Sequence, residues 1–241
     1  MEAGHLTELI QLEDSYWWHV AKRRLATRLL QEHFPPPGLV VEGGVGSSRN
    51  LLAFQELGYE VAGLDVMEPA VEHAHERGLE NVHLHDLTEP WPLADESASA
   101  VVLLDVLEHL SDPVAALQHA WQALKPGGGV IATVPAYQWL FGEWDERLGH
   151  YRRYTRRRLR EEAEAAGFTV RFLSHWNAFT LLPAIAVRTY ERLLPRSRKA
   201  VFPRVSSLTN RALLACADWE RCWMSACPTP CGLSVVGVLQ K

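Results

Sequence analysis

The sequence predicts a doubly wound α/β fold, in which helices cover both faces of a mostly parallel, seven-stranded sheet. From residue 39 onward, short apolar segments alternate with longer segments of helical periodicity, and glycines follow several of the helical segments. Strands that alternate with helices in this way form βαβ units, and consecutive units build a parallel sheet. Hydrophobic residues make up 47% and charged residues 22% of the 241 positions, which are the proportions of a globular domain.

Seven apolar segments are the expected strands, and we expect the last of them to run antiparallel to its neighbours: Leu39–Val41, Val61–Leu64, Asn81–His85, Ala100–Leu104, Val130–Val134, Phe168–Trp176 and Leu233–Leu239. The helices between them are expected over Arg49–Leu57 and Pro69–Arg77, from Pro113, and after Thr155. Asp112 and Thr155 are typical N-cap residues, and Gly58, Gly78 and Gly167 are typical of helix C-terminal ends.

We expect one domain, residues 1–241, in four consecutive parts: an N-terminal helical segment (1–37), a core (38–176), a helical insertion (177–231) and a last strand (232–241). The first part has helical periodicity over residues 5–34 and stops at Pro35–Gly38. The insertion is far longer than a usual connection between strands, and we expect it on the substrate side of the fold.

The composition narrows the classes of function. A net charge of −5 and a pI near 6.1 disfavour a general nucleic-acid binder, so no nucleic-acid partner is expected. The four cysteines lie between Cys216 and Cys231, and Met1–Leu12 lacks the pattern of a secretory signal, so reduced thiols and a cytoplasmic location are expected. The apolar segment Trp176–Val187 is too short to span a bilayer but leaves open a peripheral contact with a membrane surface.

A glycine-rich segment, Glu42–Ser48, follows the first expected strand and opens a helix. Such a loop lets a ligand approach the backbone closely, although many α/β proteins use one only to pack a helix on a strand. Asp65, at the end of the second strand, is suited to accept hydrogen bonds from ribose hydroxyls. Arg49 stands where a dinucleotide fingerprint needs a small residue, and the Glu42 carboxylate would repel a pyrophosphate. S-adenosylmethionine (SAM) is therefore favoured over NAD as the ligand.

The sequence resembles the class I SAM-dependent methyltransferases, in the broad bacterial group that acts on small molecules, lipids or glycans. The segments that carry the resemblance are Val40–Asn50 (VVEGGVGSSRN), Gly58–Asp65, Asp105–Leu110 (DVLEHL), Leu124–Pro135 (LKPGGGVIATVP) and Trp144–Gly167. Two positions depart from the usual pattern: Ser48 replaces a third glycine, and Glu42-Gly43 replaces an Asp followed by an apolar residue. The resemblance implies a Rossmann-like fold and SAM as the cofactor.

The resemblance also implies a set of cofactor contacts. Gly44 and Gly46 would line the methionine part of SAM, Asp65 would hold the ribose, and Asp86 would accept a hydrogen bond from the adenine amino group. A turn or capping role is an equally good interpretation of Asp86. The full expected set of cofactor-binding residues is Glu42, Gly43, Gly44, Gly46, Ser48, Asp65, Val66, Met67, Asp86, Leu87, Asp105 and Arg23.

Similar methyltransferases use the N-terminal helix as a lid, so we expect residues 1–37 to cover the site, with Tyr16 and Trp17 facing the substrate. Trp144, Arg153 and Tyr154 follow the fifth strand and are the other expected substrate contacts. We interpret residues 156–160, which are rich in arginine, as a solvated helix start neutralised by the glutamates that follow.

Transfer of a methyl group to a hydroxyl requires removal of a proton, and histidine is a common base for that step. His109 and His150 are therefore the candidate catalytic residues, although a lone histidine is more often a capping or solvated residue. The activity that we expect is methylation of a small-molecule acceptor, for which a lipid- or glycan-linked compound stays open. The alternatives are an NAD(P)-dependent oxidoreductase and a non-catalytic SAM-binding module.

Two groups of residues have spacings that resemble metal sites. His83 and His85 alternate on one strand, and Cys222, Cys227 and Cys231 approach the spacing of zinc ligands. Two histidines do not complete a site, and the resemblance supplies no metal at the cysteines. No metal is therefore expected from the sequence, and the oligomeric state stays open.

Overall fold

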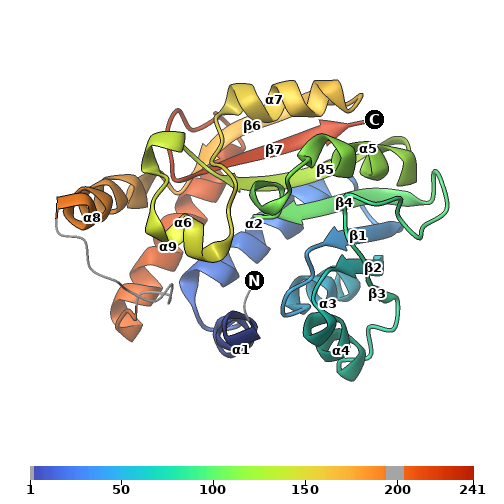
Figure 1. Ribbon diagram of the computed structural model, residues 1–241, viewed down its shortest axis with the longest axis horizontal. Coiled ribbons are helices and arrows are strands. Elements are labelled where there is room, and N and C mark those ends of the chain that lie inside the picture. The colour runs from blue at the N-terminus through green and yellow to red at the C-terminus, as the bar shows by residue number, and fades with distance from the viewer. Residues whose placement is uncertain (1–2, 194–203) are drawn as a thin grey trace.

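The computed structural model describes residues 3–193 and 204–241 and contains a seven-stranded sheet in the order β3-β2-β1-β4-β5-β7-β6 (Figure 1). Strands β1 to β5 run parallel, whereas β7 pairs antiparallel with both β5 and β6. This topology confirms the predicted doubly wound fold with an antiparallel last strand. The strands are β1 (Leu39–Gly43), β2 (Glu60–Asp65), β3 (Val82–Leu84), β4 (Ala98–Leu104), β5 (Leu124–Pro135), β6 (Thr169–Trp176) and β7 (Ser234–Gln240).

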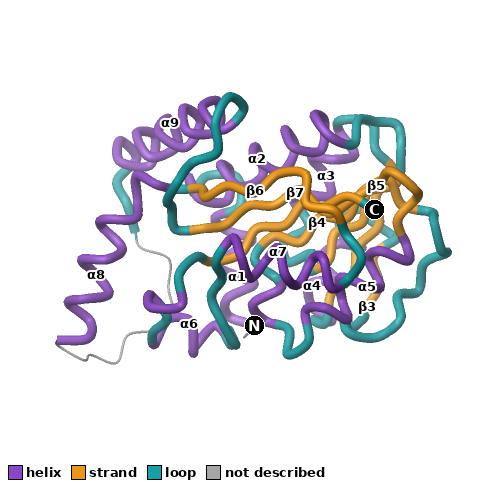
Figure 2. The backbone as a smooth tube through the Cα atoms, turned by 90° about the horizontal axis from the view of Figure 1, so that it is seen from above, coloured by secondary structure: helices purple, strands orange, loops and turns teal. Residues whose placement is uncertain are grey.

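Helices cover both faces of the sheet, as Figure 2 shows from above. Helices α5 and α7 bury their apolar sides against one face, and α2, α3, α4 and α9 cover the other. The helices are α1 (Ala3–Leu12), α2 (Trp17–His33), α3 (Arg49–Glu56), α4 (Glu68–Glu76), α5 (Pro113–Ala123), α6 (Glu143–Leu148), α7 (Arg156–Ala165), α8 (Leu181–Leu193) and α9 (Ser207–Met224).

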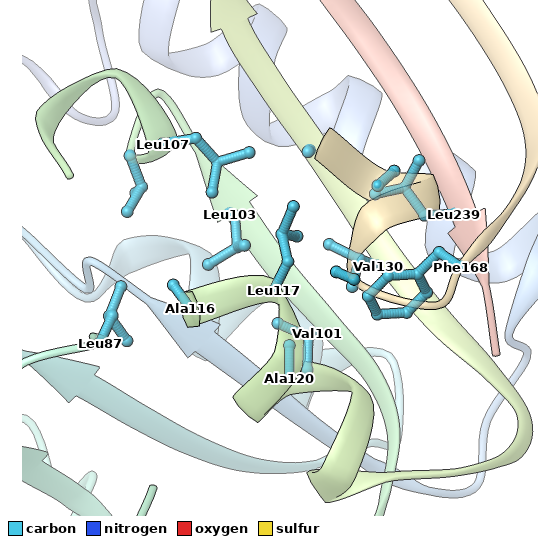
Figure 3. Packing of buried hydrophobic residues seen from close by; sticks show 14 of the residues in the cluster. Leu87, Val101, Leu103, Leu107, Ala116, Leu117, Ala120, Val130, Phe168 and Leu239 are labelled. Carbon is cyan, nitrogen blue, oxygen red and sulfur yellow. The ribbon is translucent and has the colours of Figure 1, made fainter. Parts of the chain in front are cut away.

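The central strands carry apolar side chains on both faces because helices cover both. In β4, Val101 and Leu103 pack against α5, whose Ala116, Leu117 and Ala120 point to the sheet (Figure 3). The small alanines let the helix approach the strands closely, while the leucines fill the space between them. Helix α5 begins as predicted, since the Asp112 carboxylate accepts hydrogen bonds from the backbone N–H groups of residues 114 and 115.

The N-terminal segment is two helices and not the single helix predicted over residues 5–34. Helix α1 ends at Leu12, and α2 begins at Trp17 after a turn. The side chains of the turn pair with residues outside α1 and α2: Glu13 pairs with Arg77, and Asp14 pairs with Arg49. These long-range partners stabilise a break that periodicity alone does not reveal.

The insertion between β6 and β7 is helical in its described part, as predicted, and includes α8 and α9, while residues 194–203 lie outside the described residues. Helix α9 packs along α2, and the Asn210 amide oxygen accepts a hydrogen bond from the backbone N–H of Trp17, which opens α2. Helix α8 extends away from the sheet (Figure 1). Within the described residues, no helix has the length and apolar character needed to cross a membrane.

Candidate functional site

A cavity of about 750 Å³ lies at the carboxyl ends of the parallel strands, the edge at which open α/β sheets bind ligands. One part of its wall is formed by the loops after β1, β2 and β3, and another by the segments after β4 and β5. The break between α1 and α2 also contributes, as does α8. The cavity is therefore bounded by the sheet core, the N-terminal helices and the insertion together.

The glycine-rich loop after β1 supplies backbone groups to the first part of the cavity. Gly44 and Gly46 have φ angles of +75° and +53°, which favour glycine. A Cβ atom on Gly44 would lie 2.7 Å from a methyl carbon of Val106. Asp65 holds this loop in place, since its Oδ2 accepts a hydrogen bond from the Gly46 N–H at 3.0 Å and its Oδ1 accepts one from Met67 at 2.8 Å.

Glu42 is the charged group buried deepest in this part of the site, with 1% of its surface exposed. Its Oε1 accepts a hydrogen bond from the Asn50 amide at 2.7 Å, whereas its Oε2 has no partner among the described residues. Burial raises the pKa of the Glu42 carboxyl to about 8. A cationic ligand group in the cavity would fill the place of the missing partner, as the ammonium or sulfonium of SAM would.

Most of the residues predicted to bind the cofactor line the cavity: Glu42, Gly44, Gly46, Asp65, Val66, Met67, Asp86, Leu87, Asp105 and Arg23. Asp86 also accepts hydrogen bonds from the backbone N–H and the hydroxyl of Thr88, so the turn interpretation applies to it as well. Gly43 and Ser48 do not line the cavity, which corrects the prediction for both. A Cβ on Gly43 would meet Leu103 and Leu87, and the Ser48 side chain is buried at the start of α3.

Asp105 marks the boundary between the two parts of the cavity and has a left-handed φ of +56°. Its Oδ1 accepts a hydrogen bond from the Thr133 hydroxyl at 2.9 Å, and its Oδ2 forms an ion pair with Lys22 of α2. Burial alone would raise the pKa of Asp105, but the Lys22 ammonium and these hydrogen bonds hold it below its usual value. Asp105 is therefore an ionised carboxylate whose negative charge is balanced by the Lys22 ammonium.

Three side chains gather beyond Asp105: Glu108, His109 and His150. The two imidazole rings meet edge to face, with centroids 4.6 Å apart. Glu108 is completely buried, and neither of its carboxylate oxygens is hydrogen-bonded by another described residue. Burial and the nearby Asp105 carboxylate raise the pKa of Glu108 well above its usual value. We call these three residues the acceptor cluster.

Asp145 of α6 organises the wall beside the acceptor cluster. It is completely buried, and its Oδ1 receives hydrogen bonds from His150 Nδ1 at 2.9 Å and from Arg153 Nε at 2.8 Å. Its Oδ2 accepts the Gly142 N–H at 3.0 Å and lies 3.5 Å from the Arg188 guanidinium of α8. One carboxylate thus fixes His150, Arg153 and the insertion in a common arrangement.

The predicted substrate contacts fall into two groups, those that line the cavity and one that lies in the core. Tyr16, Trp17, Trp144 and Arg153 line the cavity, but Tyr154 does not. Tyr154 lies in the core between the sheet and α7, and its hydroxyl donates to the Leu107 carbonyl at 3.3 Å. Adjacent residues on an extended segment point to opposite sides, so Arg153 faces the cavity and Tyr154 faces the core. Three arginines of α7, Arg157, Arg158 and Arg160, pair with glutamates four residues later and are exposed or partly exposed, which agrees with the interpretation of this segment as solvated.

Among the cavity residues that the sequence did not predict, Lys22 and Arg188 are the two that form ion pairs with carboxylates of the site. Lys22 lies one helical turn after Trp18 and looks like an ordinary solvated lysine, but its ammonium reaches Asp105. Arg188 lies in the insertion, 43 positions from Asp145 in the sequence numbering, and only the folded chain brings the two together. No local pattern distinguishes either residue, because the partner of each is remote in sequence.

A family model described as "Methyltransferase domain" matches residues 17–172, which include β1 to β5, the glycine-rich loop and the acceptor cluster. The chain belongs to this family of class I SAM-dependent methyltransferases. Membership implies SAM as the cofactor, and the cavity fits it through the unpartnered Glu42 oxygen, the Gly44 turn and the Asp65 carboxylate.

The curated relatives of this chain align with it over only part of their own length. A probable SAM-dependent methyltransferase from Mycolicibacterium smegmatis is 29% identical over 163 residues, which are 66% of this chain and 61% of that protein. A ubiquinone biosynthesis O-methyltransferase from Ruegeria pomeroyi is 36% identical over 95 residues, or 37% of this chain and 38% of that protein. The chain thus aligns with less than two thirds of each.

Solved structures agree with the fold. A SAM-dependent methyltransferase from Archaeoglobus fulgidus superposes with a TM-score of 0.66 at 17% identity, and the match covers all of both chains. The [4+2]-cyclase SpnF superposes with a TM-score of 0.61 at 20% identity, covering 93% of this chain and 82% of that one. Proteins that are named for different reactions therefore share this fold, so the fold alone does not give the reaction, and the function has to be argued from the site.

Proposed function

We propose that this protein transfers a methyl group from SAM to a hydroxyl of a small-molecule acceptor that carries an apolar portion, as a lipid- or glycan-linked compound would. The observation that carries the proposal is that one cavity joins the loop of Glu42 and Asp65 to the acceptor cluster. A cofactor and an acceptor held in the same cavity can be aligned for transfer, and positioning of this kind accounts for most of the catalysis in such displacements.

On the cofactor side, each residue has a separate task. When bound, SAM supplies an electrophilic methyl group on a sulfonium. Glu42 provides a negative charge for the cationic part of the ligand, and Asp65 offers carboxylate lone pairs to ribose hydroxyls while it holds the Gly46 loop. Leu87, Val66 and Met67 supply apolar contacts for a flat base.

On the acceptor side, His150 and His109 are the proposed acceptors of the hydroxyl proton. The Asp145 carboxylate accepts the hydrogen bond of His150 Nδ1, so the Nε2 lone pair of that ring remains available. In a balanced step, the acceptor oxygen forms a bond to the methyl carbon, the carbon–sulfur bond breaks with its electron pair left on sulfur, and the hydroxyl proton passes to the imidazole. Arg153 and Trp144 would hold the remainder of the acceptor.

The insertion supports an acceptor with an apolar portion. Thr180, Ala184 and Arg188 line the cavity, while Leu182 and Leu193 on the same region of chain are 76% and 74% exposed. The sequence from residue 192 to residue 217 contains six basic and no acidic residues. Apolar side chains beside a cationic segment are suited to an anionic membrane surface. A peripheral membrane contact is therefore part of the proposal, as is a cytoplasmic location, which the four free, exposed cysteines support.

Ligand-dependent thermal stability tests the proposal against its alternatives. We expect S-adenosylhomocysteine (SAH) to raise the melting temperature and NADH to leave it unchanged, because the Glu42 carboxylate would repel a pyrophosphate and Arg49 stands where a dinucleotide fingerprint needs a small residue. An NAD(P)-dependent oxidoreductase would give the opposite pattern. Transfer of radiolabel from SAM to a panel of hydroxylated lipids and glycolipids then separates an enzyme from a non-catalytic SAM-binding module, which would bind SAH but methylate none of them.

A further inference from the structure

The acceptor cluster contains an arrangement that the proton-transfer role of its histidines does not require. One ligand atom each from Glu108, His109 and His150 lies within 4.8 Å of the other two. Both Glu108 oxygens are buried without a partner among the described residues, although a carboxylate removed from water ordinarily retains hydrogen bonds or an ion pair. A buried carboxyl without such a partner, at the wall of the cavity, is open to a cationic group.

The imidazole rings of His109 and His150 are each already hydrogen-bonded to a neighbouring protein group. His150 Nδ1 is hydrogen-bonded to the Asp145 carboxylate at 2.9 Å, and the His109 ring is hydrogen-bonded to the Gly149 backbone. Metal-ligating histidines characteristically donate their second N–H to a carboxylate or a carbonyl, which fixes the ring and leaves the other nitrogen free to bind. Both histidines of the cluster have this support.

From this geometry, we propose that Glu108, His109 and His150 bind a divalent transition-metal ion. Bond lengths of about 2.1 Å with tetrahedral angles place two ligand atoms of one ion about 3.4 Å apart. The ligand atoms of the cluster lie within 4.8 Å of one another, so side-chain shifts of about an ångström would close the site. Two imidazoles and one carboxylate favour zinc, manganese, iron or cobalt over calcium, which prefers oxygen ligands alone.

The surrounding charges allow a cation to bind there. Lys22 and Arg153 are the cationic side chains near Glu108, and each is already paired, Lys22 with Asp105 and Arg153 with Asp145. Glu108 is the acidic group of the cluster that has no counter-ion, and a divalent ion that binds it would displace its proton. This proposal replaces the expectation of no metal, which considered only the remote histidines and the cysteines.

Three protein ligands leave coordination positions open toward the cavity. A cation would lower the pKa of an acceptor hydroxyl bound at one of them. In the metal-bound protein the hydroxyl proton would therefore leave to water and not to His150 or His109, because their free nitrogens would bind the ion. This role rests on the proposed function, whereas metal binding itself does not.

Metal binding is tested on the full chain after treatment with EDTA and removal of the chelator. Titration with Mn²⁺, followed by the electron paramagnetic resonance of the free ion, is expected to show one site per chain. Glu108→Gln and His150→Ala are each expected to weaken binding tenfold or more, because each removes a ligand. His83→Ala is the matched control, since His83 is an exposed histidine outside the cavity, and its affinity for Mn²⁺ is expected to equal that of the unmodified chain.

The outcomes separate this inference from the proposed function. Retained SAH binding by Glu108→Gln shows that the variant is folded, and His109→Ala serves in its place if it is not. The metal site is refuted if the unmodified chain binds no Mn²⁺ at millimolar concentration, or if the ligand variants bind it as tightly as His83→Ala. A chain that binds Mn²⁺ at these residues but neither SAH nor any acceptor would refute the proposed function and leave the metal site standing.

Discussion

The two parts of the cavity differ in what holds their charged groups. On the cofactor side, Asp65 is held by backbone N–H groups of its own loop and of the neighbouring glycine-rich loop. On the acceptor side, Asp145 is held mainly by side chains, from His150, Arg153 and Arg188. The first arrangement is built into two adjacent strand ends, whereas the second exists only after β5, α6 and α8 have come together. We therefore expect the acceptor side to be the more sensitive of the two to single substitutions.

The largest effect is expected at Asp145. Asp145→Ala leaves Arg153 and Arg188 without their buried counter-charge and should reduce the free energy of unfolding by about 3–5 kcal/mol. Chemical denaturation measures this loss. The matched control is Glu143→Ala in the same helix, which removes a surface pair with Arg147 and should cost less than about 1 kcal/mol. Equal losses for the two variants would contradict the central role of Asp145.

The same contrast explains which features of the molecule can be predicted from the sequence and which cannot. The strands, the glycine-rich loop and Asp65 were predicted because hydrophobic periodicity and loop position are local signals. Lys22 and Arg188 were missed because their partners are remote, and Tyr154 was misplaced because one step along an extended segment reverses the direction of a side chain. The break after Leu12 was missed because its stabilising partners, such as Arg77, lie elsewhere in the fold.

The next effect concerns ligand affinity on the cofactor side. Asp65→Ala should weaken SAH binding tenfold or more, since charge-assisted hydrogen bonds contribute about 1.5–3 kcal/mol. Isothermal titration calorimetry measures the change. Asp95→Ala, which removes an exposed aspartate outside the cavity, should bind SAH as the unmodified chain does. Unchanged affinity in Asp65→Ala would remove this residue from the cofactor site.

A smaller effect is expected from the ionisation of Glu42. Its pKa of about 8 keeps the carboxyl protonated in the free protein at pH 6, whereas a cationic ligand group favours the ionised form. Binding of SAM should therefore release a proton, and its affinity should rise several-fold between pH 6 and pH 8. Titrations at a series of pH values measure this slope, and Glu42→Gln should abolish it. A slope that persists in Glu42→Gln would assign the titration to another group.

The smallest effect is expected at the insertion, where apolar side chains face outward and not into the cavity. Leu182→Asp combined with Leu193→Asp places two negative charges on the exposed part of α8, so binding to vesicles containing anionic lipid should fall several-fold in a sedimentation assay. Glu72→Asp on α4 is the control, because it changes an exposed residue outside α8 and α9 and preserves its charge. SAH affinity should be the same in all three proteins, since neither leucine lines the cavity. If the double variant still binds vesicles fully, α8 is not the membrane contact, and the apolar portion of the acceptor must enter the cavity from solution.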